Sequence, residues 1–571
     1  MSAVNAIADA LLFDMLSESP DIAASMGVRD VAGRALPNDT LTDFSDAGAA
    51  RRNAVMARAR DGIAALDPAA VAPEDRMTDE VIRYLVEEGM FWLFRGRKGA
   101  DFPEMADPFN PVEGAPQILA TLLLDDHVLA SRADAEDYVT RLRRLPDALD
   151  EVIGIARTRS AEGYRTARVF LERTRAALVP MCEAAENPLL ARLRDCTALF
   201  PAVKTPLLHD AEKIVAESVA PAYRALCHEI EAQAAEDAAP VGLWARPRGE
   251  EHYAFLLRAH TTTNLTPADV HALGLEEVAA LSARIRARFA EAGIAAGTMA
   301  EMYGALQAGT ASKPAGEDGR AALKAEADRI VADLTRGCTP LFDRLPQARC
   351  IIEPVPEALE ASMGSHYTPP RAGGGRPGVF KINLKEALER PLWELPVLCR
   401  HEIMPGHHLQ LALAQEMPEL TPFRRTIVFT AYIEGWAKYA EALPEEQGLS
   451  DDPRVALCRM RGELYSTVNL VLDTGLNAMR WPFERAVAYF KDMTGASGTL
   501  AEHIAARSLF HPGQLCSYKI GMREMFALKG LLAKARGPAF RIQEFHDLAL
   551  GEGALPLSLL RRRFDAAIHA T

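Results

Sequence analysis

Apolar residues recur at three- and four-residue spacing along most of this chain, and alternating strand-like patterns are scarce. This spacing places apolar side chains on one face of an α-helix. One such stripe, in residues 135–155, consists of Tyr138, Leu142, Leu145, Leu149 and Ile153. Residues 276–294 and 321–337 follow the same pattern. The chain is therefore predicted to be mainly α, with one large multi-helix body.

Only two segments favour β-strands, residues 349–355 and 378–384, which are short and rich in β-branched or aromatic residues. Residues 364–377 between them are rich in Gly and Pro, and we expect a loop there. A small β element near the segment with the chemistry is the expected result.

No break along the chain is long enough to be a linker between domains, and no internal repeat is visible. We therefore predict one interlocked helical domain over residues 1–571. An alternative is two lobes, about 1–250 and 251–571, on either side of a deep cleft.

Charge and composition exclude several classes of protein. The net charge of −14 and the lack of a basic patch disfavour nucleic acid as a partner. No apolar run is long enough to cross a membrane, and the first residues lack a basic, apolar signal sequence. Eight cysteines without a C-x-x-C pair indicate reduced thiols. These features predict a soluble cytoplasmic protein without a membrane partner.

The densest group of potential metal ligands is His401-Glu402 followed by His407-His408, within residues 393–443. Pro396 and the helix formers after it place His401-Glu402 on a helix. The zincin motif H-E-x-x-H binds zinc through two histidines one turn apart, and its Glu activates water. Here Pro405 stands where the second histidine would be, and histidines come six and seven residues after the first.

The choice between His407 and His408 as the second ligand stays open at this point. On an unbroken helix, His407 would point about 120° away from His401, whereas His408 would point in nearly the same direction about 10 Å further along. Pro405 and Gly406 can kink or bulge the helix and return one of them to His401. Its direction favours His408 as the ligand, with His407 facing the substrate.

Zinc in a catalytic site needs a third protein ligand. Glu434 and Glu441 lie seven residues apart in the apolar, aromatic segment 430–443, so they share one face of a predicted helix. A carboxylate there is costly to bury unless it is paired or bound to metal. We expect Glu434 to be the third ligand and Glu441 to orient a ligand histidine.

The run HEIMPGHHLQ from His401, followed by EGWAKYAE from Glu434, resembles the bacterial family DUF885 of unknown function. Segments beginning at His252, Leu470, His511 and Phe545 resemble further landmarks of that family, so the resemblance covers nearly the whole chain. The family is similar in plan to helical gluzincin peptidases such as angiotensin-converting enzyme and thimet oligopeptidase.

The resemblance implies a tyrosine near the cleft at Tyr518, which we expect to stabilise the oxyanion. The chain differs from the family at two positions, where Asn469 and Asn477 replace an Arg and a His. This difference opens the possibility of another substrate preference. Asp473 between them is expected to steady a ligand histidine.

His366 and Tyr367 are expected to bind substrate from the Gly- and Pro-rich segment, and Lys519 and Arg461 are candidates to bind a substrate carboxylate. With Glu402 as general base, the residues predict a zinc-dependent hydrolase of short peptides. Two alternatives remain. One is a metal-dependent amide hydrolase acting on a non-peptide or modified amino-acid substrate, and the other is a metal-binding protein without turnover.

Overall fold

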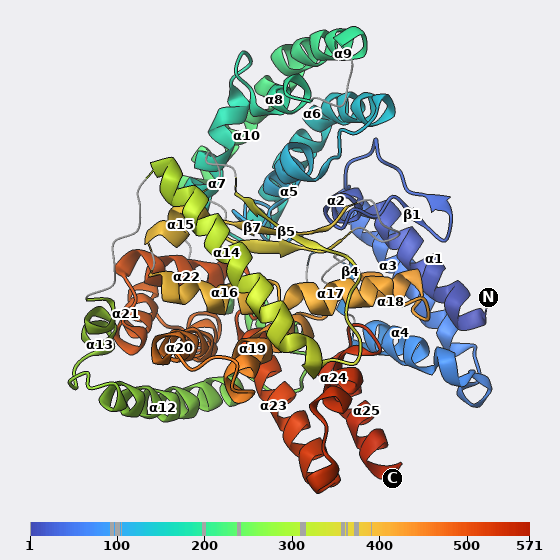
Figure 1. Ribbon diagram of the computed structural model, residues 1–571. Coiled ribbons are helices and arrows are strands. Elements are labelled where there is room, and N and C mark those ends of the chain that lie inside the picture. Colours follow the sequence, from blue (N-terminus) through green and yellow to red (C-terminus); the bar gives the residue numbers. More distant parts are fainter. Residues whose placement is uncertain are drawn as a thin grey trace. The chain divides into compact units, whose positions relative to one another are not determined.

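The computed structural model describes residues 2–88, 90–91, 96–97, 103, 105–196, 201–236, 241–308, 316–355, 360, 364–370, 376–389 and 391–570. As predicted, the fold is mainly α, with helices throughout and only small sheets (Figure 1). The chain divides into two compact units. The first contains Met1–His252 and Thr421–Phe423, and the second contains Tyr253–Leu420 and Arg424–Thr571.

The first unit is built around the long helix α6, Arg132–Ala161. The apolar stripe predicted in this segment is buried along its whole length, so the expected helix is confirmed. The other helices of this unit are α1 (Ala3–Glu18), α2 (Pro20–Ser25), α3 (Asp46–Ala64), η1 (Pro68–Ala70), η2 (Pro73–Asp75), α4 (Arg76–Glu88), α5 (Ala115–Thr121), η4 (Leu122–Asp126), α7 (Arg168–Leu178), η5 (Val179–Cys182), α8 (Pro188–Arg194), α9 (Pro201–Ile214), η6 (Val215–Val219), α10 (Ala220–Ala234) and η7 (Leu243–Ala245). Its strands form two antiparallel pairs: β1 (Asp30–Val31) with β2 (Arg34–Ala35), and β3 (Met90–Phe91) with β4 (Gly96–Arg97).

The second unit contains the residues predicted to carry the chemistry, and α11 (Gly249–Thr261) begins in the first unit and ends in the second. Its helices are α12 (Pro267–Glu291), α13 (Met299–Gln307), α14 (Gly316–Cys338), η8 (Thr339–Leu341), α15 (Leu384–Glu389), η10 (Leu392–Glu394), α16 (Leu395–Glu402), α17 (His407–Glu416), α18 (Pro422–Thr426), α19 (Thr430–Glu446), α20 (Pro453–Asn477), α21 (Phe483–Thr494), α22 (Gly498–Phe510), α23 (Cys516–Arg536), η11 (Gly537–Ala539), α24 (Ile542–Leu550) and α25 (Leu557–His569).

A three-stranded sheet in the second unit has the order β5-β7-β6. The two predicted strands are present as β5, Cys350–Pro354, and β7, Gly378–Ile382, and they pair in parallel. The segment between them was expected to be loop throughout, and this is wrong for β6, His366–Thr368, which pairs antiparallel with β7. β6 forms in spite of the Gly- and Pro-rich composition of its segment, because its backbone is hydrogen-bonded to β7. The part of that segment at residues 371–375 lies outside the described residues.

The helices α19 and α23 approach each other closely because each has a glycine at their contact. A Cβ atom on Gly435 would lie 2.4 Å from the carbonyl carbon of Gly521, and one on Gly521 would lie 1.9 Å from the carbonyl oxygen of Ala431. No larger residue fits at either position without moving a backbone. This contact places the residues beside Gly435 close to the first turns of α23.

Across the described part of the chain, none of the helices is both long and apolar enough to cross a membrane.

Candidate metal centre

The predicted site residues His401-Glu402 and His407-His408 lie on two separate helices, which are joined by a four-residue turn. α16 ends at Glu402, and α17 begins at His407. Sequence reasoning expected one helix with a bulge, but the helix stops completely. Ile403 leaves the helical conformation, with φ −118° and ψ −82°. The direction in which His407 points is therefore set by the turn and not by helical periodicity.

Two contacts determine how tightly this turn closes. A Cβ atom on Gly406 would lie 1.9 Å from the carbonyl oxygen of His401, so the turn folds back onto the end of α16 only because residue 406 has no side chain. The indole Nε1 of Trp436 on α19 donates a hydrogen bond of 2.9 Å to the carbonyl oxygen of Pro405. The turn is thus held against the helix that contains Glu434.

His401, His407 and Glu434 converge on one point. The Nε2 atoms of His401 and His407 lie 3.5 Å and 3.6 Å from Oε2 of Glu434, and the three potential ligand atoms are all within 4.8 Å of one another. Zinc bonds of about 2.0–2.1 Å in a tetrahedron separate ligand atoms by about 3.4 Å. The distances from both histidines to the carboxylate oxygen therefore fit a zinc ion.

The Oε2 atom of Glu434 is buried and has no hydrogen-bond partner among the described residues. An unpaired buried carboxylate oxygen is costly, because it loses water without gaining another partner. Burial would raise the pKa of Glu434, but interactions with His401 and His407 lower it below its usual range. The carboxylate is therefore anionic at neutral pH, and a cation between the three side chains would satisfy it.

Glu441 lies where it was expected, on the far side of a ligand histidine. Its Oε1 atom is 2.9 Å from Nδ1 of His401. Lys438 donates hydrogen bonds of 2.9 Å and 3.0 Å to the two oxygens of the same carboxylate. A carboxylate at Nδ1 fixes the ring and leaves Nε2 as the atom that faces the metal position.

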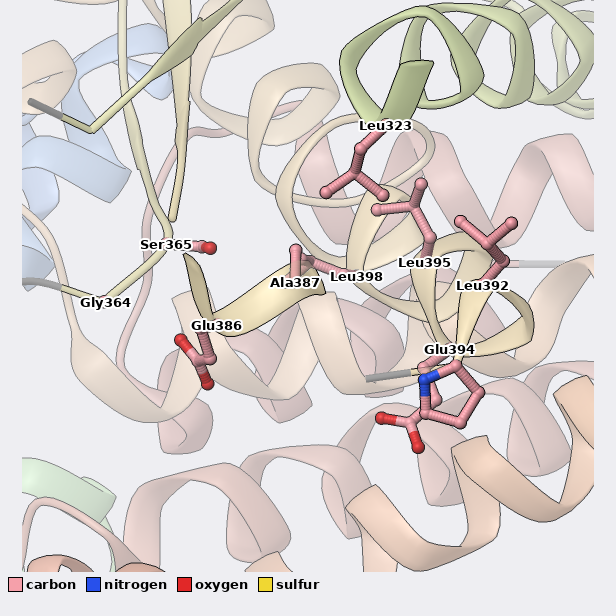
Figure 2. A pocket seen from close by; sticks show the side chains of 10 residues that line it. Leu323, Gly364, Ser365, Glu386, Ala387, Leu392, Glu394, Leu395 and Leu398 are labelled. Atoms are coloured by element: carbon pink, nitrogen blue, oxygen red, sulfur yellow. The ribbon is translucent and has the colours of Figure 1, made fainter. Parts of the chain in front are cut away.

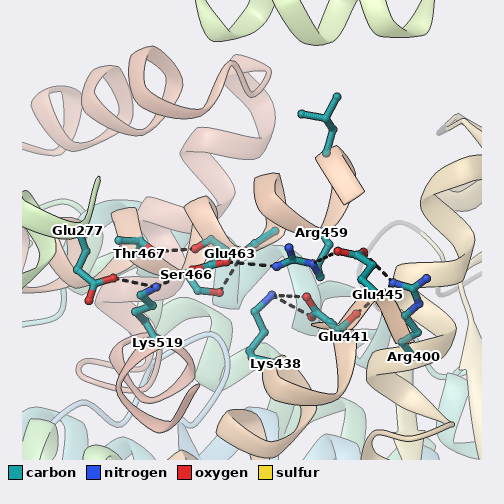
Figure 3. Close-up of polar contacts among 12 residues, drawn as sticks. Glu277, Arg400, Lys438, Glu441, Glu445, Arg459, Glu463, Ser466, Thr467 and Lys519 are labelled. Carbon is teal, nitrogen blue, oxygen red and sulfur yellow. Dashed lines mark hydrogen bonds and ion pairs between the residues drawn. The ribbon is translucent and has the colours of Figure 1, made fainter. Parts of the chain in front are cut away.

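A chain of buried and half-buried ion pairs extends from this region, as Figure 3 shows. Its members alternate in charge, and the order is Arg400, Glu445, Arg459, Glu463, Lys519 and Glu277. Lys519 is held by Glu463 and Glu277 at 2.8 Å and 2.9 Å. Lys519 was a candidate to bind a substrate carboxylate, but these two glutamates already neutralise its charge.

The second candidate anchor, Arg461, is also paired. It forms an ion pair with Glu394, and its guanidinium lies 4.8 Å from the ring centre of Tyr303. Burial would otherwise leave this charge without compensation. Neither of the two proposed anchors is therefore free to bind substrate.

Glu402 is buried at the end of α16 beside the metal position. Its carboxylate has no hydrogen-bond partner among the described residues, although it interacts electrostatically with His401, His407, Glu434 and His366. Burial raises its pKa, and the two histidines on either side act against that rise. A carboxylate in this position can accept a proton from a molecule bound at the centre.

Tyr518, on the first turn of α23, lies close enough to Glu434 for the two to interact. Burial raises its pKa to about 12, and the negative charge of Glu434 contributes to that rise. Arg507 on α22 donates a hydrogen bond of 3.3 Å to the Tyr518 hydroxyl oxygen. The sequence analysis did not select Arg507. Its place four residues before the HPGQ segment was the one available signal.

His408 does not lie in the metal cluster, so the preference for it over His407 is not supported by the geometry. Its Nδ1 atom is 2.8 Å from the Tyr367 hydroxyl, and its Nε2 atom is 3.1 Å from the carbonyl oxygen of Ala348. A Cβ atom on Gly378 would lie 2.4 Å from that hydroxyl, which explains the glycine. His408 and Tyr367 therefore attach α17 to the sheet. His366, which precedes Tyr367 in β6, interacts electrostatically with Glu402.

Asp473 is not beside a ligand histidine, contrary to expectation. It accepts hydrogen bonds from the Tyr253 hydroxyl at 2.6 Å and from the backbone N–H of Gly513 at 2.8 Å. The side chain of Asn477 donates to the carbonyl oxygens of Asp473 and Ser508, and Asn469 is buried as well. These residues support the packing of α20 and do not form part of the cluster.

A cavity of about 220 Å³ lies beside the first turns of α16 (Figure 2). Leucines from α14, η10 and α16 form its apolar wall, and the carboxylates of Glu386 and Glu394 lie at its edge. None of the three residues of the metal cluster lines it.

One family model and two solved structures relate the chain to other proteins. The family model described as "Bacterial protein of unknown function (DUF885)" matches residues 20–564. A crystal structure of "the putative lipoprotein from Colwellia psychrerythraea" superposes with a TM-score of 0.90 at 25% identity, over 100% of both chains. The structure of "a putative lipoprotein of unknown function from Shewanella oneidensis" gives a TM-score of 0.70 at 17% identity, over 98% of this chain and 99% of the other. No curated protein matches the chain.

The two structural descriptions contradict the predicted cytoplasmic location. Both proteins are described as lipoproteins, a class that is attached to membranes by covalently bound lipid. The prediction came from the absence of a recognisable signal sequence and from cysteine use, and neither feature reports a lipid anchor. The predicted cytoplasmic location is therefore wrong.

Proposed function

The chain belongs to the bacterial protein family DUF885, and from this premise and the geometry of the cluster we propose that it is a zinc-dependent peptidase acting on short peptides. The observation that carries the proposal is the convergence of His401, His407 and Glu434, with a buried Glu434 oxygen that has no hydrogen-bond partner among the described residues. Two imidazoles and one carboxylate are a ligand set typical of catalytic zinc.

The surrounding residues have the roles that peptide hydrolysis requires. Zinc, when bound, would act as a Lewis acid toward water and the scissile carbonyl. Glu402 would accept a proton from the attacking water and return it to the leaving amine. The Tyr518 hydroxyl would donate a hydrogen bond to the carbonyl oxygen as it gains negative charge. Glu441 would keep His401 in the required orientation.

Burial of the cluster favours short substrates. The side chains of His401, His407 and Glu434 are only 16%, 11% and 15% exposed. A folded protein cannot bring a backbone segment to such a site without local unfolding, whereas a short extended peptide can.

The test is digestion of a peptide library by the purified protein, with zinc measured by elemental mass spectrometry. We expect about one zinc per chain, cleavage that a chelator abolishes, and recovery when zinc is added back. Glu402→Gln, which retains the three ligands, is the matched control for contaminating peptidases. Zinc binding with turnover of non-peptide amides alone would instead support a metal-dependent amide hydrolase that acts on non-peptide or modified amino-acid substrates. Zinc binding without any turnover would support a metal-binding protein.

A further inference from the structure

Arg507 lies in the last turn of α22, half-buried, and uses only part of its guanidinium within the protein. Its Nη2 atom donates to Oε1 of Gln514 at 3.1 Å and to the hydroxyl oxygen of Tyr518 at 3.3 Å. The Nε and Nη1 groups have no hydrogen-bond partner within the described residues. Three N–H donors, one on Nε and two on Nη1, are thus unused.

Arg507 also forms no ion pair with a carboxylate of the described residues, unlike three other arginines of the same unit. Arg400, which is buried, and Arg459 and Arg461, which are half-buried, lie in the same unit, and each forms an ion pair with a glutamate. A half-buried guanidinium without an ion-pair partner loses hydration and keeps N–H donors that no protein group accepts. This makes Arg507 suited to an anion that comes from outside the protein.

The position of Arg507 relative to the metal centre follows from the contact between α19 and α23. Gly435 meets Gly521 at that contact, and Glu434 directly precedes Gly435. Tyr518 lies one helical turn before Gly521, on the same side of α23. Because Arg507 is hydrogen-bonded to Tyr518, its guanidinium lies next to the centre. Consistent with this, Tyr518 raises the pKa of Arg507, burial opposes the rise, and Glu434 adds to it.

We propose that Arg507 binds a carboxylate of the peptide substrate and so determines where the peptide is cleaved. This inference rests on the proposed peptidase function. The free donors of a guanidinium match the two oxygens of a carboxylate in geometry and charge. The carboxylate comes either from the free C-terminus of the peptide or from an acidic side chain near the scissile bond. In the first case, the enzyme removes residues from the C-terminal end.

The experiment compares three versions of one short peptide: free C-terminal acid, neutral C-terminal amide, and amide with one Glu near the scissile bond. The wild type is expected to favour carboxylate-bearing peptides over the neutral amide. Arg507→Gln should raise KM for the favoured peptides about 10- to 100-fold, the range expected when hydrogen bonds to a charged group are lost. The KM for the neutral amide should not rise, because this peptide brings no carboxylate to the guanidinium, and any loss of kcat through Tyr518 should be shared by all three peptides. The two carboxylate-bearing peptides distinguish the C-terminal source from the side-chain source.

Arg523→Gln is the matched control, because Arg523 is an arginine of α23 that pairs with Glu277 and is 42% exposed. It should leave the three KM values unchanged. An equal loss of kcat on all three peptides in Arg507→Gln, without a selective rise in KM for the carboxylate-bearing peptides, would overturn the proposal, since the residue would then act only through Tyr518 or the fold.

Binding gives a second measurement that does not depend on turnover. Calorimetric titration of the zinc-loaded Glu402→Gln protein with all three peptides should give a lower Kd for at least one carboxylate-bearing peptide than for the neutral amide. This difference should disappear when Arg507→Gln is added. If neither carboxylate-bearing peptide binds more tightly than the neutral amide, the carboxylate site is rejected whether or not the protein hydrolyses peptides. Failure of the peptidase function alone would instead appear as selective binding without cleavage.

Discussion

Nδ1 of His401 lies 2.9 Å from Oε1 of Glu441, on the side of the ring away from the predicted zinc position. The same carboxylate is held by Lys438, so the orientation of a predicted ligand depends on two further residues of α19. Such partners of ligand histidines typically contribute 10- to 100-fold to metal affinity.

Glu441→Gln should therefore weaken zinc binding by about 10- to 100-fold. Gln keeps the shape of the side chain, but it carries no charge to support His401. Competition against a chelator of known affinity measures the change. Glu463→Gln is the matched control, since Glu463 is also buried and paired with Lys519. An equal loss of affinity in both variants would show that the effect comes from the fold.

His407→Ala and His408→Ala should differ in kind although the residues are adjacent. His407 lies 3.6 Å from Glu434, whereas both ring nitrogens of His408 are engaged by Tyr367 and Ala348. We expect His407→Ala to lose zinc and His408→Ala to keep it with a lower melting temperature. Elemental analysis after dialysis gives the answer. Zinc retained by His407→Ala would remove this residue from the ligand set.

Glu402→Gln should reduce turnover by about 10²- to 10⁴-fold while zinc stays bound, because Gln cannot accept the proton from water. The measurement is kcat on a cleaved peptide, together with zinc content. If activity persists at the wild-type level with zinc bound, Glu402 is not the general base. Loss of zinc together with activity would indicate a role in holding the metal.

Much of the fold could be predicted from periodicity and composition, since helices leave a regular apolar pattern and strands are rich in β-branched or aromatic residues. The stripe on α6 and the strands β5 and β7 are confirmed examples. β6 could not be predicted in this way, because a three-residue strand depends on its partner β7 for hydrogen bonds more than on its own composition.

For the site, the sequence indicated which residue types gather but not which of two adjacent histidines turns inward. That choice depends on how tightly the turn at residues 403–406 closes, which is a backbone property without periodicity. Arg507 escaped notice for a related reason. A single arginine among 64 basic residues becomes distinctive only when its lack of a carboxylate partner in the described structure is known.

Gly521→Ala should destabilise the second unit, because its Cβ atom would lie 1.9 Å from the carbonyl oxygen of Ala431. Overpacking of this kind typically costs about 1–3 kcal/mol. Gly530→Ala on the same helix is the control, since a Cβ atom there meets nothing within 4 Å. It should be neutral or stabilising by up to about 1 kcal/mol. Thermal unfolding of both variants tests the claim, and equal melting temperatures would contradict it.

Asp473 predicts a pH dependence of stability. Burial raises its pKa to about 7 in the folded chain, against hydrogen bonds from Tyr253 and Gly513 that lower it, and its ordinary value is 3.8. Between about pH 4 and pH 7, the unfolded chain releases a proton that the folded chain retains. This contribution therefore favours unfolding increasingly as pH rises through that window, and it is constant above the window.

Asp473→Asn should remove this contribution, so its melting temperature should rise relative to wild type between pH 5 and pH 7.5. Scanning calorimetry at both pH values measures the difference. The exposed Asp492→Asn is the control and should keep the wild-type dependence. A difference between Asp473→Asn and wild type that does not change with pH would refute the assignment.

The turn between α16 and α17 also brings two helix ends of opposite partial charge to the centre. An α-helix has a partial charge of about −0.5 at its C-terminal end and about +0.5 at its N-terminal end. α16 ends at Glu402 and α17 begins at His407, so these opposite ends meet beside the cluster. Their partial charges oppose each other there. The attraction for a cation is thus left to the carboxylates of Glu402, Glu434 and Glu441, and the backbone dipoles add little to it.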